Sequence, residues 1–348
     1  MIDSRRLFKH LILVVGLVAL AAGVGMAASA PALNIEAESA ILVDAQSGQV
    51  LFEKNADLLL PPASMAKIMT MLLVMEDVDA GRIKLTDQVT TSAYASMIGG
   101  SQVYLKEGEV FTVEELLKAV AIHSANDAAV ALAEHVSGNV EVFVDAMNRR
   151  AQQLGMKETY YANPDGLPSE AGQPPTLSSA RELAIVAREL IKHPKILQWS
   201  SIQQADFRTE PKSILYNTNK LVGRYAGLDG LKTGHTEEAG WCLTATAKRG
   251  DVRLVSVVMR TASETERQKQ TATLLDYGFR NFTRTQVLPE GAEVGTLRVR
   301  NGWPGAIKVI TDQALAPLVQ RGFSEPIIKE VRLEKVSAPL RQDKRWAW

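Results

Sequence analysis

Residues 64–75 read SMAKIMTMLLVM, so a helix built from them carries apolar side chains on every side. A helix that is apolar all round is stable only when other elements surround it. Pro61 and Pro62 stand directly before it, and proline is compatible with the first turn of a helix. The segment therefore predicts a buried helix at the centre of a globular domain.

Strand patterns lie on both sides of this helix in the sequence. Two runs, Ala40–Asp44 and Gln49–Glu53, flank a turn that contains glycine and predict a hairpin, and Gly240–Ala247 with Arg253–Met259 predicts a second one. Helices are expected between them, the first opened by a capping-box pattern; their ranges are 112–122, 127–135, 141–154 and 178–192. Strands at both ends of a helical middle predict one α+β domain.

Residues 1–30 predict a signal peptide. Arg5, Arg6 and Lys9 precede an apolar run over 11–28, and the segment ends in the small residues Ala28-Ser-Ala30. The run approaches the length that spans a bilayer, so an uncleaved membrane helix is the alternative, but its glycines and small-residue end favour cleavage. The general export route is favoured over the twin-arginine route, for which residues 4–8 are the only indication.

Charge and cysteine content exclude several classes of protein. The chain has 39 basic and 39 acidic residues, so no net field attracts it to nucleic acid. It has one cysteine, Cys242, and therefore no internal disulfide; on a probable core strand this residue is expected to be a small buried hydrophobe. The five histidines show no zinc-binding spacing, and neither a metal nor a cofactor is predicted.

The pattern of apolar and polar residues changes at about Leu288. Short alternating stretches such as Ala306–Ile310 and Ile327–Leu333 predict a small β-rich second domain over 286–348. The chain ends in Lys344–Trp348, where two tryptophans beside basic residues are compatible with peripheral contact with the inner membrane. A short soluble tail is favoured, because about eight residues are too few for a stable amphipathic helix.

Three short motifs carry chemistry. Ser64-x-x-Lys67 sets a hydroxyl and an amine one helical turn apart, where a lysine of lowered proton affinity can activate the serine. Ser124-Ala-Asn126 adds a second hydroxyl and an amide, although Ser124 to Asp127 also matches a capping box for the next helix. Lys232-Thr233-Gly234 predicts a strand edge at which a peptide can pair with the backbone.

In this order the motifs resemble those of the serine penicillin-recognising enzymes. More narrowly, the chain resembles the low-molecular-mass penicillin-binding proteins that are D-alanyl-D-alanine carboxypeptidases, over about residues 35–283. Further shared segments are 40–45, 62–67, 99–101, 123–128, 163–167, 217–220 and 229–236. The resemblance implies a penicillin-binding/β-lactamase-like domain over 31–285, an antiparallel sheet with a helical cluster, followed by the small β-rich domain.

The resemblance also implies a role for each residue of the motifs. Ser64 would be the acylated nucleophile, Lys67 its general base and Ser124 the proton relay to the leaving D-alanine. The substrate peptide and its carboxylate would be bound by a second group of residues: Asn126, Lys232, Thr233, Gly234, His235 and Arg267. The backbone N–H groups of Ser64 and His235 would form the oxyanion hole. For Arg267, the neighbouring Arg253 and Arg260 remain alternatives.

The expected function is removal of the terminal D-alanine from peptidoglycan stem peptides, with β-lactams as covalent inhibitors. An exported location, in the periplasm or at the outer face of the cytoplasmic membrane, follows from the signal peptide. A class A β-lactamase is disfavoured, because residues 158–167 lack the E-x-x-L-N arrangement of those enzymes. An endopeptidase of the same fold and a sensor that stays acylated remain alternatives.

Overall fold

The computed structural model describes residues 33–300, 305–322 and 336–337. These residues divide into two compact units, Leu33–Arg280 and a second unit that begins at Asn281. The predicted signal peptide, the strand expected at 327–333 and the end of the chain lie outside the described residues. In the described part, no helix combines the length and the apolar character needed to cross a membrane.

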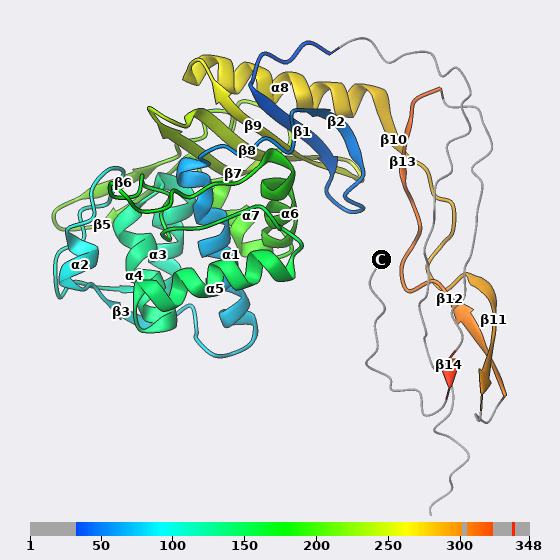
Figure 1. Cartoon of the computed structure of the whole chain (residues 1–348), viewed down its shortest axis with the longest axis horizontal. Coiled ribbons are helices and arrows are strands. Elements are labelled where there is room, and N and C mark those ends of the chain that lie inside the picture. The colour runs from blue at the N-terminus through cyan, green and yellow to red at the C-terminus, as the bar shows by residue number, and fades with distance from the viewer. Residues whose placement is uncertain (1–32, 301–304, 323–335, 338–348) are drawn as a thin grey trace, which may run out of the picture. The chain divides into compact units, whose positions relative to one another are not determined.

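The first unit is built on a five-stranded antiparallel sheet in the order β2-β1-β9-β8-β7 (Figure 1). Its strands are β1 (Ser39–Asp44), β2 (Val50–Lys54), β7 (Leu228–Thr236), β8 (Gly240–Arg249) and β9 (Val252–Thr261). Both predicted hairpins are confirmed, β1 with β2 and β8 with β9. The hairpins join where β1 pairs with β9, and β7 lies at one edge of the sheet.

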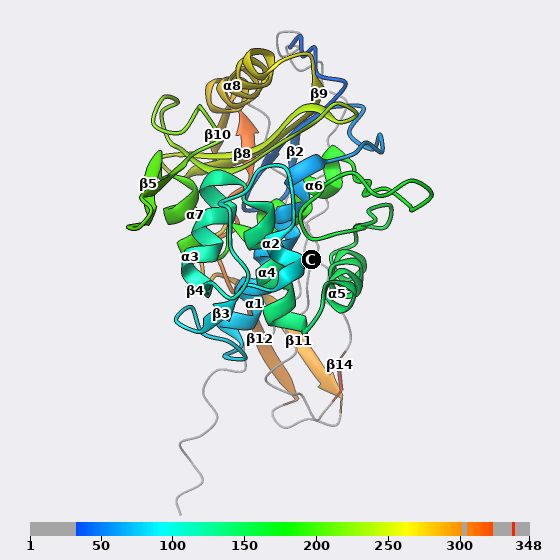
Figure 2. The ribbon, with the colours of Figure 1, turned by 90° about the vertical axis from the view of Figure 1, so that its left-hand side faces the viewer.

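Helices cover both faces of this sheet. Helix α8 (Glu264–Asn281) lies along one face, and the helical cluster lies on the other (Figures 1 and 2). A Cβ atom on Gly278 of α8 would stand 2.5 Å from Leu254 Cδ1 and 2.9 Å from Leu42 Cδ2, so this helix approaches the sheet closely. Because β9 is covered on both faces, its residues 254–259 are buried without alternation, and all of them except Ser256 are apolar.

The predicted central helix is confirmed. A 3-10 turn, Ala63–Ala66, carries Ser64 and leads into α1 (Lys67–Asp79), whose side chains are buried along most of its length. Around it lie α2 (Ala93–Ser96), α3 (Val113–Lys118), a π-helical segment (Ala119–His123), α4 (Asn126–Ser137), α5 (Val140–Gln153), α6 (Ala180–Leu190) and α7 (Pro194–Ser200). Two small strand pairs complete the unit, β3 (Gln88–Thr90) with β4 (Val110–Thr112) and β5 (Gln204–Arg208) with β6 (Ser213–Tyr216).

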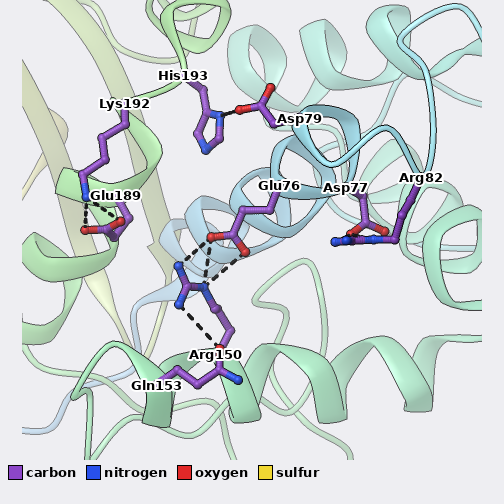
Figure 3. Close-up of polar contacts among 9 residues, drawn as sticks. All are labelled: Glu76, Asp77, Asp79, Arg82, Arg150, Gln153, Glu189, Lys192 and His193. Atoms are coloured by element: carbon purple, nitrogen blue, oxygen red, sulfur yellow. Dashed lines mark hydrogen bonds and ion pairs between the residues drawn. The ribbon is translucent and has the colours of Figure 1, made fainter. Parts of the chain in front are cut away.

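Polar contacts hold the end of α1 that is remote from Ser64 (Figure 3). Arg150 of α5 forms an ion pair with Glu76 at 2.6 Å. His193, in the turn before α7, places its Nδ1 2.8 Å from Asp79 Oδ2. These contacts join α1 to two neighbouring elements, so its direction within the cluster is fixed at the C-terminal end.

The second unit is small and rich in strands, as the sequence predicts. Its elements are β10 (Phe282–Arg284), β11 (Glu293–Arg300), β12 (Ala306–Ile310), β13 (Leu318–Gln320) and β14 (Val336–Ser337). Strand β11 pairs antiparallel with β12 and parallel with β14, and β10 pairs with β13. Leu297 and Val309 form a small hydrophobic core between β11 and β12.

Candidate active site

Lys67 makes three short hydrogen bonds around its amine. Its Nζ lies 2.9 Å from Ser64 Oγ, 2.6 Å from Asn126 Oδ1 and 2.6 Å from the backbone oxygen of Asp165. The amide oxygen and the carbonyl oxygen can only accept, so each takes one N–H of the amine. When the amine is neutral, two N–H groups are occupied in this way and its lone pair is left for the hydroxyl of Ser64.

Burial supports the neutral form of this amine. The Lys67 side chain is fully buried, whereas Ser64 is partly exposed. Burial lowers the pKa of Lys67 to about 8, against the opposing effect of the Asp165 and Asp127 carboxylates. An amine with this pKa is neutral in about a tenth of the molecules at pH 7, and it is placed to accept the proton of Ser64.

Asn126 links the amine to a neighbouring loop. While Oδ1 accepts from Lys67, Nδ2 donates to the backbone oxygen of Gly99 at 2.7 Å and the backbone N–H donates to Ser101 O at 2.7 Å. The amide of Asn126 is thereby fixed in both orientation and position.

Ser124 ends the π-helical segment in the left-handed conformation, with φ 69°, and is buried. The capping-box alternative for Ser124 and Asp127 is wrong. The residue at the N-cap of α4 is Ala125, and the Asp127 carboxylate accepts instead from the backbone N–H groups of Val103 and Leu105. A left-handed non-glycine residue costs about 1–2 kcal/mol, and such residues cluster at functional sites.

The Lys232-Thr233-Gly234 motif lies on β7, at the edge of the sheet next to the turn that carries Ser64. Lys232 is buried and donates to the backbone oxygen of Thr233 at 2.9 Å, and Thr233 Oγ1 lies 2.7 Å from Thr218 Oγ1. Burial holds the pKa of Lys232 well below its usual value, and the positive charges of Lys67 and Arg267 act in the same direction. An anionic ligand group beside Lys232 would oppose these effects and favour the charged form of its amine.

His235 and Arg267 both contact the ring of Trp241. The exposed His235 ring stacks on Trp241 with centroids 3.8 Å apart, and the guanidinium of Arg267 lies 5.2 Å from the centroid of Trp241. Arg267 itself is buried. All three candidate arginines are held in ion pairs, Arg267 with Glu264 at 3.0 Å, Arg253 with Asp229 and Arg260 with Glu38.

The loop 163–167, which belongs to none of the three motifs, lies against the turn that carries Ser64. A Cβ atom on Gly166 would lie 2.0 Å from Ala63 O and 3.1 Å from Ser64 N, and Gly166 has a φ of 78°. Ala63 is itself left-handed, with φ 48°. The Asn-Pro-Asp-Gly pattern does indicate a turn, but the sequence gives no sign of what that turn contacts.

The structure gives less support to a metal site or to Cys242 as a nucleophile. Within residues 33–300, 305–322 and 336–337, no group of three or more histidine, cysteine or acidic residues is arranged to hold a metal. Cys242 is buried, as expected, and burial raises the pKa of its thiol to about 11, so it is not an activated nucleophile.

Comparison with known proteins agrees with this geometry. The family model described as D-alanyl-D-alanine carboxypeptidase matches residues 25–263. D-alanyl-D-alanine carboxypeptidase DacF of Bacillus subtilis is 41% identical over 311 residues, 88% of this chain and 79% of the relative. Penicillin-binding protein 5 of Haemophilus influenzae superposes with a TM-score of 0.75 at 32% identity, covering 88% of this chain and 90% of the other. Penicillin-binding protein D2 of Listeria monocytogenes, solved in an ampicillin-bound form, gives a TM-score of 0.65 at 33% identity, covering 72% and 99%.

Proposed function

The chain belongs to the D-alanyl-D-alanine carboxypeptidase family, and we propose that it removes the terminal D-alanine from peptidoglycan stem pentapeptides through an acyl-enzyme on Ser64. One observation carries the proposal. The buried Lys67 amine has two fixed acceptors, Asn126 Oδ1 and Asp165 O, and its remaining position faces Ser64 Oγ at 2.9 Å. A neutral amine held in this way is a general base directed at one hydroxyl.

Acylation begins when Lys67 takes the proton of Ser64 and Ser64 Oγ attacks the carbonyl carbon of the penultimate D-alanine. The negative charge that develops on the carbonyl oxygen is stabilised by the backbone N–H groups of Ser64 and His235. As the C–N bond breaks, Ser124 donates its hydroxyl proton to the leaving amine and takes up the proton held by Lys67, so that Lys67 becomes neutral again. The departing group is free D-alanine, and an ester on Ser64 remains.

Substrate binding is assigned to β7 and the residues near it. A peptide can add as a further strand along the sheet edge, where Lys232, Thr233 and Gly234 provide charge, a hydroxyl and room for close approach. The terminal carboxylate is attracted by the positive charge of Lys232 and, from beneath Trp241, of Arg267. Asn126 and His235 complete the contacts with the substrate peptide.

Water then hydrolyses the ester and regenerates Ser64. A β-lactam acylates the same serine, and the resulting ester is expected to leave slowly, which makes the antibiotic a covalent inhibitor. The ampicillin-bound form of the Listeria protein supports this part of the proposal. An endopeptidase that cuts D-alanyl cross-links is the second candidate, because the same site chemistry serves a larger leaving group.

Export is part of the proposal. The basic start, apolar run and small-residue end of residues 1–30 support a cleaved signal peptide, and the peptidoglycan substrate lies outside the cytoplasmic membrane. The catalytic domain is assigned to 31–285 and the β-rich domain to 286–348. A vesicle-binding assay tests whether the end of the chain makes peripheral contact with the membrane.

The proposal is tested by release of D-alanine from diacetyl-Lys-D-Ala-D-Ala, with mass spectrometry for a penicillin adduct. The chain lacking residues 1–30 is expected to release D-alanine and to gain one adduct on Ser64. Ser64→Ala should lose both, because Ser64 Oγ is the hydroxyl that lies within hydrogen-bonding distance of Lys67 Nζ. Ser201→Ala, which removes an exposed hydroxyl whose hydrogen bond within the described residues goes to Gln198 O, is the control and should retain both. A stable adduct without any release of D-alanine would favour the sensor or the endopeptidase.

A further inference from the structure

The mechanism above makes no use of the carboxyl group of Asp165. This side chain is 3% exposed, and one of its oxygens accepts from the backbone N–H of Leu167 at 2.8 Å. The carbonyl oxygen of the same residue is the acceptor 2.6 Å from Lys67 Nζ. A buried acid whose own backbone binds the general base is placed to influence that base.

The loop that carries Asp165 is fixed to α1 and to the nucleophile turn. Asn163 accepts from the N–H of Gly166 at 2.7 Å and donates to Leu167 O at 2.9 Å. Thr70 of α1 donates to Pro164 O at 2.5 Å. Since the backbone is held on both sides of Asp165, its carboxylate lies at most about 7 Å from Lys67 Nζ, given ordinary covalent dimensions.

We propose that Asp165 is a positioning residue for catalysis: its buried carboxylate is the counter-charge of Lys67 and sets the pH range in which that amine can activate Ser64. This inference rests on the proposed function, because it concerns Lys67 as the base of acylation. It adds a group that lies in neither the S-x-x-K, the S-x-N nor the K-T-G motif.

Three charged groups act on Lys67 from the elements around it: Asp165 from the loop, Asp127 from α4 and Lys232 from β7. Asp127 accepts backbone N–H bonds from Val103, Leu105 and Ala128, so much of its charge is already compensated. The Asp165 carboxylate accepts from the backbone N–H of Leu167, and its own backbone N–H also stabilises the charged form. Asp165 is accordingly the stronger of the two acids acting on Lys67.

The two groups titrate as a pair. Burial raises the pKa of the Asp165 carboxyl, and the charge of Lys67 opposes that rise. In return the ionised Asp165 raises the pKa of Lys67, against the larger effect of burial. Removing the negative charge should therefore lower the pKa of Lys67 further, and the neutral, active amine should be present at lower pH.

The test is the pH dependence of the second-order rate constant for acylation by a fluorescent penicillin. For the unchanged chain the rate should rise with pH as Lys67 loses its proton. Asp165→Asn keeps the size of the side chain and an oxygen for the Leu167 N–H, and removes the charge. In this variant, we expect the part of the rate–pH curve that rises with pH, its rising limb, to move to lower pH by about one unit or more. That shift is roughly tenfold faster acylation on the acid side of the curve.

Glu170→Gln is the matched control, since it removes the same charge from an exposed position shortly after the loop. Solvent screening should leave its rising limb in place. A limb that stays unmoved in Asp165→Asn, moves to higher pH, or moves equally in both variants overturns the inference. If Asp165→Asn fails to fold, Asp165→Ser gives the same readout, because serine can also accept the Leu167 N–H.

The same assay separates failure of this inference from failure of the proposed function. If Ser64→Ala is labelled as fast as the unchanged chain, Ser64 is not the nucleophile and the proposed function fails. If labelling requires Ser64 but the limb does not respond to Asp165, the function stands and only the role of Asp165 is lost.

Discussion

Lys67 and Lys232 are two amines buried in one site, and their different partners suggest different tasks. Lys67 is surrounded by acceptors and by two acids, which keep its pKa at about 8 in spite of burial. Lys232 donates to the backbone oxygen of Thr233, and burial with two nearby cations lowers its pKa further. The first amine is suited to proton transfer with Ser64, and the second is suited to an anionic ligand.

Asn126→Ala should impair both acylation and stability. It removes the acceptor that holds Lys67 and the hydrogen bond to the backbone oxygen of Gly99, and loss of such a bond costs about 0.5–1.5 kcal/mol. With Lys67 free to turn away from Ser64, we expect the penicillin acylation rate to fall by roughly 10²-fold, the low end for loss of a general base. Stopped-flow acylation and thermal unfolding measure the two effects.

The control for that prediction is Asn148→Ala. Asn148 also bridges backbone groups, through two hydrogen bonds of 2.8 Å to Tyr161, but it lies outside the candidate site. It should lose comparable stability and keep its acylation rate. Equal loss of rate in both variants would mean that Asn126 acts only through the fold.

At this scale the motifs predicted which residues come together, but not what fixes them. Ser64, Lys67 and Asn126 do meet in the structure, while their catalytic roles stay predictions. The hydrogen bonds that Asn126 and Lys67 make to the backbone oxygens of Gly99 and Asp165 were beyond the reach of the sequence, because every residue has a backbone oxygen. A pattern of side chains carries no information about which carbonyl a folded loop will present.

Among the elements, the turn Ala63–Ala66 is held between two segments that approach it through glycines. Gly166 lies against Ala63 O, and a Cβ on Gly234 of β7 would stand 2.5 Å from Pro62 O. The nucleophile therefore has backbone on both sides rather than flexible side chains. Its position depends on two close approaches that any larger residue would prevent.

Gly234→Ala should displace β7 from this turn. Because the obstructing atom is a backbone oxygen, relief requires movement of the strand or of the turn, and we expect a loss of about 1–3 kcal/mol with at least a tenfold fall in acylation. Unfolding by urea and the acylation rate measure these effects.

Gly250→Ala is the comparison for the glycine prediction. Gly250 has a φ of 61° in the turn between β8 and β9, and nothing lies within 4 Å of a Cβ placed there. This variant should lose about 1 kcal/mol from backbone strain and retain its acylation rate. A Gly234→Ala variant with unchanged acylation would show that the close approach is not needed for the reaction.

The helices and strands with a regular sequence pattern could be predicted from the sequence. The central helix, both hairpins and the capping box at Thr112 and Glu115 are confirmed, since each depends on local pattern or local hydrogen bonds. The change to a π-helix at Ala119–His123 and the left-handed Ser124 were not predicted. These distortions are imposed by packing between distant parts of the chain, which local propensity cannot report.

For the whole molecule, the division at Arg280 separates the chemistry from the second unit. The five-stranded sheet and every residue of the candidate site lie within Leu33–Arg280. Helix α8 closes this unit, with Leu274, Leu275 and Phe279 buried.

A chain that ends after Asn281 should therefore acylate at a rate within about twofold of the full chain, because it keeps the sheet and α8 intact. A chain that ends after Thr261 is the control. It exposes the sheet face that α8 covers, and burial of each large apolar side chain contributes about 1.5–3 kcal/mol, so it should not fold. Penicillin labelling and circular dichroism of both chains measure the outcome, and an inactive but folded chain ending at Asn281 would contradict the prediction.

The pairing of β1 with β9 also governs when activity can appear. Ser39 lies opposite Met259, so the first strand of this sheet to be synthesised waits for the last strand of the same sheet. At ordinary rates of translation this interval is roughly ten seconds or longer, and such distant pairings are slow to form. A chain that has not yet reached β7 contains Ser64 and Lys67 but lacks the strand that packs against their turn. Hydrolytic competence is thus expected late, as a property of the completed fold, and shorter chains carry Ser64 without the elements that fix it.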